Sequence, residues 1–228
     1  MRLLQKQTKT MKITKKELAP IFVIIIMLIF AASLYKAPCI TMVPTHWNAE
    51  GQIDGWSSKA FATLFVSLLT IAIYLLMLFL PKVDPLKENY QYFEKQYYFI
   101  RLFLVVFFAG LFFLTFFSAL GFRPNTMYFM VSSLSLLFIF MGVIMPKIKR
   151  NWFVGIKTPW TLQSDEVWIK THKLAGKSMI IGGVLAFFTI FLPSATSFWL
   201  FLIIVLTSVL LPVLYSYLFY RKLKLFKK

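Results

Sequence analysis

Six long runs without a charged residue constrain the fold of this chain more than any other feature. Each run is 17 to 23 residues long, the length that an α-helix needs to cross a hydrocarbon core about 30 Å thick. The runs cover residues 19–35, 60–80, 102–120, 127–145, 178–195 and 198–220. The composition, 59% apolar and 14% charged, also departs from that of soluble domains, which are about 25% charged. The sequence therefore predicts an all-α, polytopic integral membrane protein with six transmembrane helices.

The distribution of Lys and Arg predicts the orientation. With the N-terminus inside, 22 of the 25 basic residues lie on the cytoplasmic side, and only Lys36, Lys59 and Arg123 lie outside. Basic residues accumulate on the cytoplasmic side of membrane proteins, so we expect a plasma membrane protein with both termini cytoplasmic. The net charge of +17 then reflects the membrane orientation and the attraction of basic residues to anionic lipids. No soluble segment is long enough to form a nucleic-acid-binding domain, so the expected partner is the lipid bilayer.

This orientation divides the chain into six parts. They are a basic cytoplasmic segment (1–18), a first helix pair with an extracellular loop (19–80), the third and fourth helices (81–145), a cytoplasmic loop with an amphipathic helix (146–177), the fifth and sixth helices (178–220) and a basic tail (221–228).

The apolar runs lack the residues that most membrane chemistry requires. Ion-coupled carriers and intramembrane proteases place an ionisable residue at depth, and none of the six runs contains one. A neutral pathway lined by Ser132, Ser133 and Ser135 is the weaker alternative, because such hydroxyls usually bond to their own helix. The two histidines are expected on opposite sides of the membrane, so no nucleophilic constellation forms. We expect no catalytic residue and no cofactor, and we place function in the loops.

The predicted outer loop, residues 44–56, combines turn-forming residues with two tryptophans. Closely spaced Asn, Gly and Asp favour tight turns, and Trp is typical of membrane interfaces. A metal site made of His46, Glu50 and Asp54 would need a helix to converge, which the nearby glycines disfavour. We favour a folded extracellular cap that recognises a ligand. Its candidate binding residues are His46, Trp47, Asn48, Gly51, Asp54 and Trp56.

The predicted inner loop ends in an amphipathic helix. Ser164 is a suitable N-cap, and Asp165 and Glu166 suit the first turn. Glu166, Lys170, Lys173 and Lys177 then share one face. This helix either rests on the inner leaflet or docks a cytoplasmic partner. The candidate structural or partner-docking residues of the loop are Asn151, Gly155, Lys157, Thr158, Pro159, Trp160, Trp168, Thr171, His172 and Gly176.

Both loops resemble known sequence signatures. The segment PTHWNAEGQIDGW at 44–56 resembles a short domain of unknown function found near the N-terminal end of many small bacterial membrane proteins. The segment NWFVGIKTPWTL at 151–162, continuing through Trp168 and His172 to Gly176, is similar to the signature of the SdpI/YfhL immunity family. One departure is Lys157, where the family commonly has Arg. Lys keeps the positive charge but lacks the guanidinium group, which can donate two parallel hydrogen bonds to one carboxylate or phosphate.

The resemblance implies a binding protein and not an enzyme. Members of this family with an assigned role protect the producing cell from a secreted toxic peptide, so the implied partner is a hydrophobic peptide toxin. The family also includes a receptor that holds a transcriptional repressor at the membrane, which leaves signal relay as an alternative. A small-solute or lipid transporter is the third and least favoured alternative.

Overall fold

The computed structural model describes residues 15–226, and six of the helices in this range are long and apolar enough to cross a membrane. The chain is therefore a polytopic membrane protein, as predicted. The elements, in order, are η1 (Lys15–Glu17), α1 (Leu18–Lys36), β1 (Met42–Trp47), β2 (Ile53–Ser58), α2 (Lys59–Val83), η2 (Lys87–Tyr92), α3 (Glu94–Ala119), α4 (Thr126–Ile144), η3 (Met145–Lys147), α5 (Pro159–Gln163), α6 (Asp165–Phe188), η4 (Thr189–Phe191) and α7 (Ser194–Phe226).

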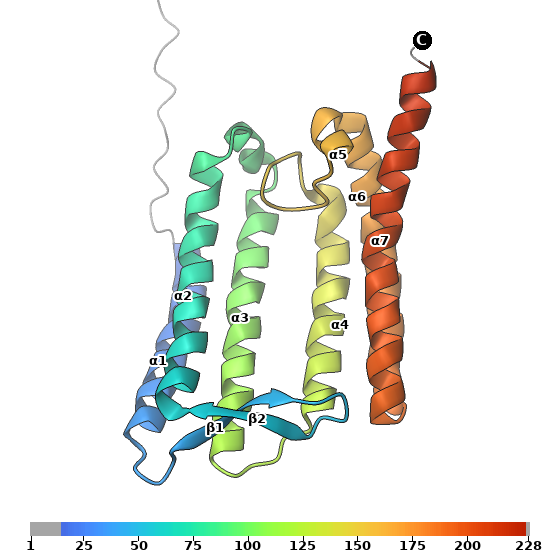
Figure 1. The fold of residues 1–228 in the computed structure, drawn as a ribbon. Helices are drawn as coiled ribbons and strands as arrows, with labels where there is room; N and C mark the ends of the chain where they lie inside the picture. The colour runs from blue at the N-terminus through green and yellow to red at the C-terminus, as the bar shows by residue number, and fades with distance from the viewer. Residues whose placement is uncertain (1–14, 227–228) are drawn as a thin grey trace, which may run out of the picture.

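The membrane helices form two groups of three. Helices α1, α2 and α3 pack on one another, α6 packs on α4 and α7, and α3 touches α4 only lightly. Figure 1 shows the two groups side by side, with the antiparallel β1–β2 hairpin at one end of the bundle. The segment containing η2, the loop before α5, and α5 itself lie at the opposite end (Figure 1). We call these the hairpin end and the α5 end.

The hairpin connects the two groups at its end of the bundle. It follows α1 and precedes α2, and β1 packs against α3. Its turn reaches α4, because a Cβ atom built on Gly51 would lie 3.5 Å from the backbone nitrogen of Met127. One small sheet therefore spans the boundary between the groups (Figure 1).

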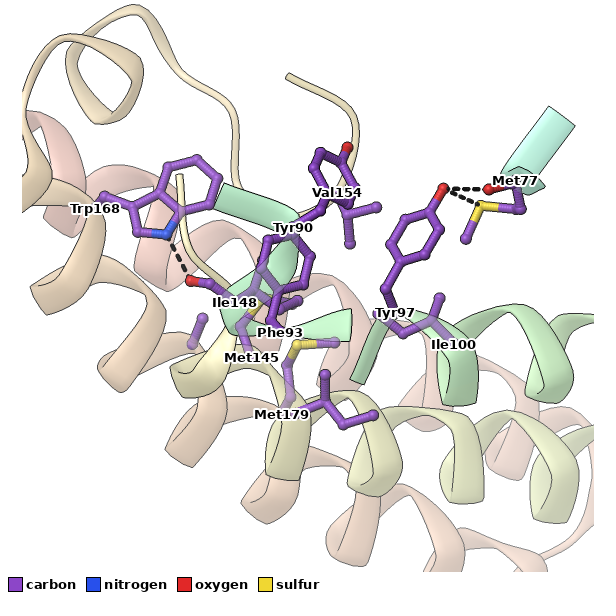
Figure 2. Close-up of a cluster of buried hydrophobic side chains, with 12 residues drawn as sticks. Met77, Tyr90, Phe93, Tyr97, Ile100, Met145, Ile148, Val154, Trp168 and Met179 are labelled. Atoms are coloured by element: carbon purple, nitrogen blue, oxygen red, sulfur yellow. Dashed lines mark hydrogen bonds between the residues drawn. The ribbon is translucent and has the colours of Figure 1, made fainter. Parts of the chain in front are cut away.

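A cluster of buried apolar side chains joins the groups at the α5 end. The cluster combines Tyr90, Phe93 and Tyr97 with residues from η3 and α6, and Figure 2 shows the Tyr97 hydroxyl bonded to Met77 of α2. The indole N–H of Trp168 donates to the Ile148 carbonyl at 2.8 Å, which fixes the ring inside the cluster. Burial of aromatic side chains contributes strongly to packing, so this cluster is the main apolar contact between the groups.

Small residues let α4 and α6 approach closely. A Cβ atom on Gly176 would lie 2.8 Å from the Gly142 carbonyl oxygen, and one on Gly183 would lie 2.9 Å from the Ser135 carbonyl oxygen. Such backbone contact is typical of small-residue faces in membrane helices. Gly176, a candidate site residue, is therefore a packing position.

Two helix boundaries differ from the uncharged runs. Helix α3 begins at Glu94, well before residue 102, and includes the buried Arg101. The run at 178–195 is interrupted, since α6 ends at Phe188, η4 follows, and α7 begins at Ser194 after Pro193, whose carbonyl accepts the N–H of Ser197 at 2.8 Å. A search for uncharged residues stops at the first charge, whereas the helical hydrogen bonds continue past it.

Arg101 is neutralised inside the first helix group. Its guanidinium forms an ion pair with Glu17, and both side chains are buried. The Tyr74 hydroxyl donates to the other Glu17 oxygen at 3.0 Å. The helices therefore contain a buried ion pair that joins the start of α1 to α2 and α3.

Candidate functional site

The hairpin turn is built by the side chain of Asn48. Its Oδ1 atom accepts the backbone N–H of Gln52 at 2.8 Å and of Glu50 at 3.1 Å. Gly51 has a φ of +80°, which residues with a Cβ rarely adopt. Asn48 and Gly51 thus determine the path of the chain at the tip.

The hairpin places His46 and Asp54 on neighbouring strands. The His46 Nδ1 and Asp54 Oδ1 atoms are 2.6 Å apart, and both side chains are largely exposed. A Cβ atom on Gly55 would lie 2.7 Å from the Cβ of His46, so the pair requires glycine at that position. Within residues 15–226 no three His, Cys, Asp or Glu side chains gather as metal ligands.

A cavity of about 430 Å³ lies between the hairpin and the helices. Most of its lining is apolar and comes from helices of both groups, and no Lys, Arg, Asp or Glu contributes. The lining residues are Thr45, His46, Trp47, Asn48, Gly51, Val66, Leu111, Leu114, Thr115, Thr126, Met127, Met130, Val131, Leu134, Phe198 and Phe201. This volume lies in the range of small-ligand pockets.

The candidate residues of the outer loop divide into three kinds. His46, Trp47, Asn48 and Gly51 line the cavity. Asp54 lies outside the lining and contacts it through His46. Trp56 is exposed and does not line the cavity.

Sequence reasoning missed the helical part of the lining. Thr115, Met130 and Leu134 are ordinary residues in apolar runs, and nothing in their local pattern separates them from lipid-facing neighbours. They become a site only because two helix groups and the hairpin meet there.

At the α5 end, Asn151 organises the loop. Its buried amide oxygen accepts the backbone N–H groups of Phe153 at 2.9 Å and Val154 at 2.7 Å. Its amide nitrogen donates to the carbonyls of Lys149 and Val154, each at 2.9 Å. The side chain thereby supplies hydrogen-bond partners to backbone groups that have none within an irregular buried loop.

His172 is held as a neutral imidazole by two backbone groups. Its Nε2 atom accepts the N–H of Ile156 at 3.1 Å, and its Nδ1 atom lies 2.8 Å from the Trp168 carbonyl. The proton is therefore on Nδ1. The ring also stacks on Trp168, with centroids 4.0 Å apart.

Gly155 allows the loop to pass over this histidine. Its φ is +114°, and a Cβ atom there would collide with Nε2 of His172. Both the backbone conformation and the lack of space therefore require glycine.

The short helix α5 is attached to α7. Thr158 caps it by a reciprocal pair of hydrogen bonds with Thr161, and Pro159 occupies its first turn, as expected for these residue types. The Trp160 indole N–H donates to the hydroxyl of Ser216 in α7. The loop is thus tied to α6 and α7 of the second group.

The remaining candidates of this loop have simpler environments. Lys157 is exposed and donates to the Phe153 carbonyl at 3.0 Å. The Thr171 hydroxyl is buried and has no hydrogen-bond partner among the described residues. Trp168 and Gly176 pack as described above.

Asp84, which sequence reasoning also missed, connects the two helix groups. It is buried, and its carboxylate accepts the Tyr90 hydroxyl at 3.0 Å and the N–H of Trp152 at 2.9 Å. Asn89 adds a second connection by donating to the Arg150 carbonyl at 2.7 Å. Burial, and then the hydrogen bond to Asp84, raise the pKa of the Tyr90 phenol above its ordinary value of 10.0. The available signal was an acid four positions after the end of the second apolar run.

These features define a class: a six-helix polytopic membrane protein in which two structured loops join two helix groups at opposite ends. The model of the SdpI/YfhL protein family matches residues 147–216. A domain of unknown function, DUF1648, matches residues 21–71. These matches confirm the resemblance drawn from the two loops, and each includes one of them.

One curated relative supports the same assignment. The chain is 28% identical over 109 residues to the protein named immunity protein SdpI of Bacillus subtilis (strain 168), a match that covers 46% of this chain and 51% of the relative. The chain thus spans about half the length of the curated relative it matches. No solved structure matches.

Proposed function

We propose that this chain is an immunity protein of the plasma membrane that protects the cell by binding a secreted hydrophobic peptide. The observation that carries the proposal is the apolar cavity at the hairpin end, which has no Lys, Arg, Asp or Glu in its lining. The similarity to a relative named as an immunity protein supports the biological role. The two family matches, each of which includes one of the structured loops, support the same role.

The proposal requires the hairpin to face the outside. Within residues 15–226, only Lys36, Lys59 and Arg123 lie in the segments at the hairpin end, whereas the other 16 basic residues lie toward the opposite end. The positive-inside preference then puts the hairpin outside and both termini in the cytoplasm. Labelling of the exposed Cys39, the single cysteine, by a membrane-impermeant maleimide on intact cells tests this orientation.

Binding, and not catalysis, is the activity that the side chains support. Both nitrogens of His172 are engaged by backbone groups, which leaves no free base there. His46 contacts Asp54, and neither adjoins a Cys. The role of the α5-end loop in this proposal is structural, because its polar side chains hold the two helix groups together.

Survival tests the function directly. The gene is expressed in a sensitive host that is exposed to each peptide encoded beside it, with the empty vector as control. We expect survival to rise with the gene for at least one peptide. Equal killing with and without the protein, at confirmed membrane expression, would contradict the proposal.

Signal relay is a second candidate, favoured by one exposed face of α6. Glu166, Lys170, Lys173 and Lys177 are all exposed at the α5 end, where a soluble partner has access in the proposed orientation. Charged surfaces of this kind steer association. Relay predicts that a DNA-binding protein co-purifies with the membranes only when peptide is present, and that Lys170→Glu with Lys173→Glu abolishes this capture.

A further inference from the structure

The cavity at the hairpin end offers a more specific inference about what is bound. It rests on the proposed function, since it identifies the part of the peptide that this protein holds. We infer that the cavity receives a short uncharged segment of the peptide, with its large apolar side chains inside and one backbone carbonyl bonded to the Thr115 hydroxyl.

The volume sets the size of the segment. A cavity of about 150 Å³ holds one benzene ring, so a cavity of about 430 Å³ accommodates roughly two or three large apolar side chains. The whole of a membrane-active peptide does not fit. The protein therefore holds one short part of its ligand.

The lining sets the chemistry of the segment. The walls are mainly Leu, Met, Val and Phe side chains, and His46 is the one ionisable lining residue. Because a charge buried without a partner is strongly unfavourable, the segment must be uncharged. An apolar segment gains free energy when it leaves water for such a site.

Thr115 provides a specific polar contact. Its side chain lines the cavity, the residue is 9% exposed, and its hydroxyl makes no hydrogen bond within residues 15–226. Threonines in helices commonly bond to the carbonyl four residues earlier, as Thr70 does here. A hydroxyl at the wall of a cavity can donate a hydrogen bond to a carbonyl oxygen, so Thr115 is suited to donate to a ligand.

The hairpin favours a peptide over a lipid chain. Three of the polar lining residues, Thr45, His46 and Asn48, belong to β1 and the turn that follows it, so the backbone of β1 lies beside the cavity. The sheet has two strands, so β1 has an edge without a strand partner among the described residues. Extended peptides commonly pair with such edges.

The test measures binding of a defined probe to the purified chain in phosphatidylcholine nanodiscs. The probe is the capped peptide acetyl-Leu-Phe-Val-Leu-amide with a fluorescent tag, and empty nanodiscs correct for partition into lipid. A second probe replaces Phe by Lys. We expect saturable binding of the first probe, and binding of the second that is weaker by about tenfold or more, because of the buried charge.

Two pairs of variants locate the binding. Leu134→Phe fills the cavity, and its control Leu136→Phe adds the same ring on the lipid-facing side of α4, where Leu136 is 55% exposed. Thr115→Val removes the hydroxyl, and Thr115→Ser keeps it. We expect about tenfold weaker binding for Leu134→Phe, about three- to tenfold for Thr115→Val, and no change for the two controls. Equal unfolding midpoints verify that the variants fold.

Two results would overturn the inference. One is equal binding by the wild type and Leu134→Phe. The other is a phospholipid that stays bound in native mass spectrometry, is absent from Leu134→Phe and is not displaced by the peptide, since a lipid chain then fills the cavity.

Survival assays separate this inference from the proposed function. If the wild type and Leu134→Phe protect cells equally, the function holds and the cavity assignment is wrong. If neither protects but the binding difference persists, the cavity assignment holds and the immunity function is wrong.

Discussion

The carboxylate of Asp84 accepts the backbone N–H of Trp152 at 2.9 Å, across 68 positions of the sequence. The same oxygen accepts the Tyr90 hydroxyl, and the other oxygen accepts the N–H of Leu86 at 2.7 Å. One buried carboxylate thus connects the end of α2 to the loop that precedes α5. Among the described residues, it is one of the few polar connections between the two helix groups, which have little contact through α3 and α4.

Replacing Asp84 by Asn tests this connection. The amide has one acceptor oxygen and two donors, so it cannot accept all three hydrogen bonds, and we expect a loss of about 1.5–3 kcal/mol in the free energy of unfolding. The control is Glu88→Gln, an exposed acid in η2, which should change stability little. Thermal unfolding in detergent measures both. If the two variants unfold at the same temperature, Asp84 does not connect the groups.

The environment of Gly155 predicts that Gly155→Ala lowers the free energy of unfolding by more than the positive φ alone would. Gly155→Ala combines a positive φ with a collision against His172, whereas Gly121→Ala combines a φ of +88° with open space. We expect Gly121→Ala to cost on the order of 1 kcal/mol of unfolding free energy, and Gly155→Ala to cost clearly more. Similar losses for the two variants would show that the contact with His172 relaxes easily.

The six membrane helices could be predicted from sequence because lipid requires long uncharged helices, and hydropathy reports this property directly. The start of α3 could not, since a paired charge such as Arg101 remains compatible with a buried helix. The turn residues Asn48 and Gly51 were readable from local chemistry. The cavity was not, because Thr115 and Leu134 acquire their roles only from helix packing.

The raised pKa of Tyr90 predicts a pH-dependent contribution to stability. The phenol is neutral in the folded state above pH 10.0, where the unfolded phenol ionises. Its stabilising contribution is therefore complete below that pH and falls as the pH rises further, by up to about 1.4 kcal/mol per pH unit. Comparing unfolding of the wild type and Tyr90→Phe between about pH 8 and pH 11 should show the difference shrinking above pH 10. A constant difference across this range would mean that Tyr90 ionises equally in both states.

The ion pair between Glu17 and Arg101 predicts a non-additive effect of mutation. Glu17→Gln leaves a buried guanidinium without its counter-charge, and we expect a loss of about 3–5 kcal/mol in unfolding free energy. Adding Arg101→Met removes the stranded charge, so the double variant should be more stable than Glu17→Gln alone. The matched control is Glu94→Gln, which breaks the exposed pair with Lys16, whose atoms are 3.6 Å apart; such pairs contribute about 0–1 kcal/mol. Unfolding of the wild type, Glu17→Gln, Arg101→Met and the double variant gives the coupling. If the losses from the two mutations are additive, the two charges do not stabilise each other. Water would then solvate the Arg101 guanidinium beside Glu17.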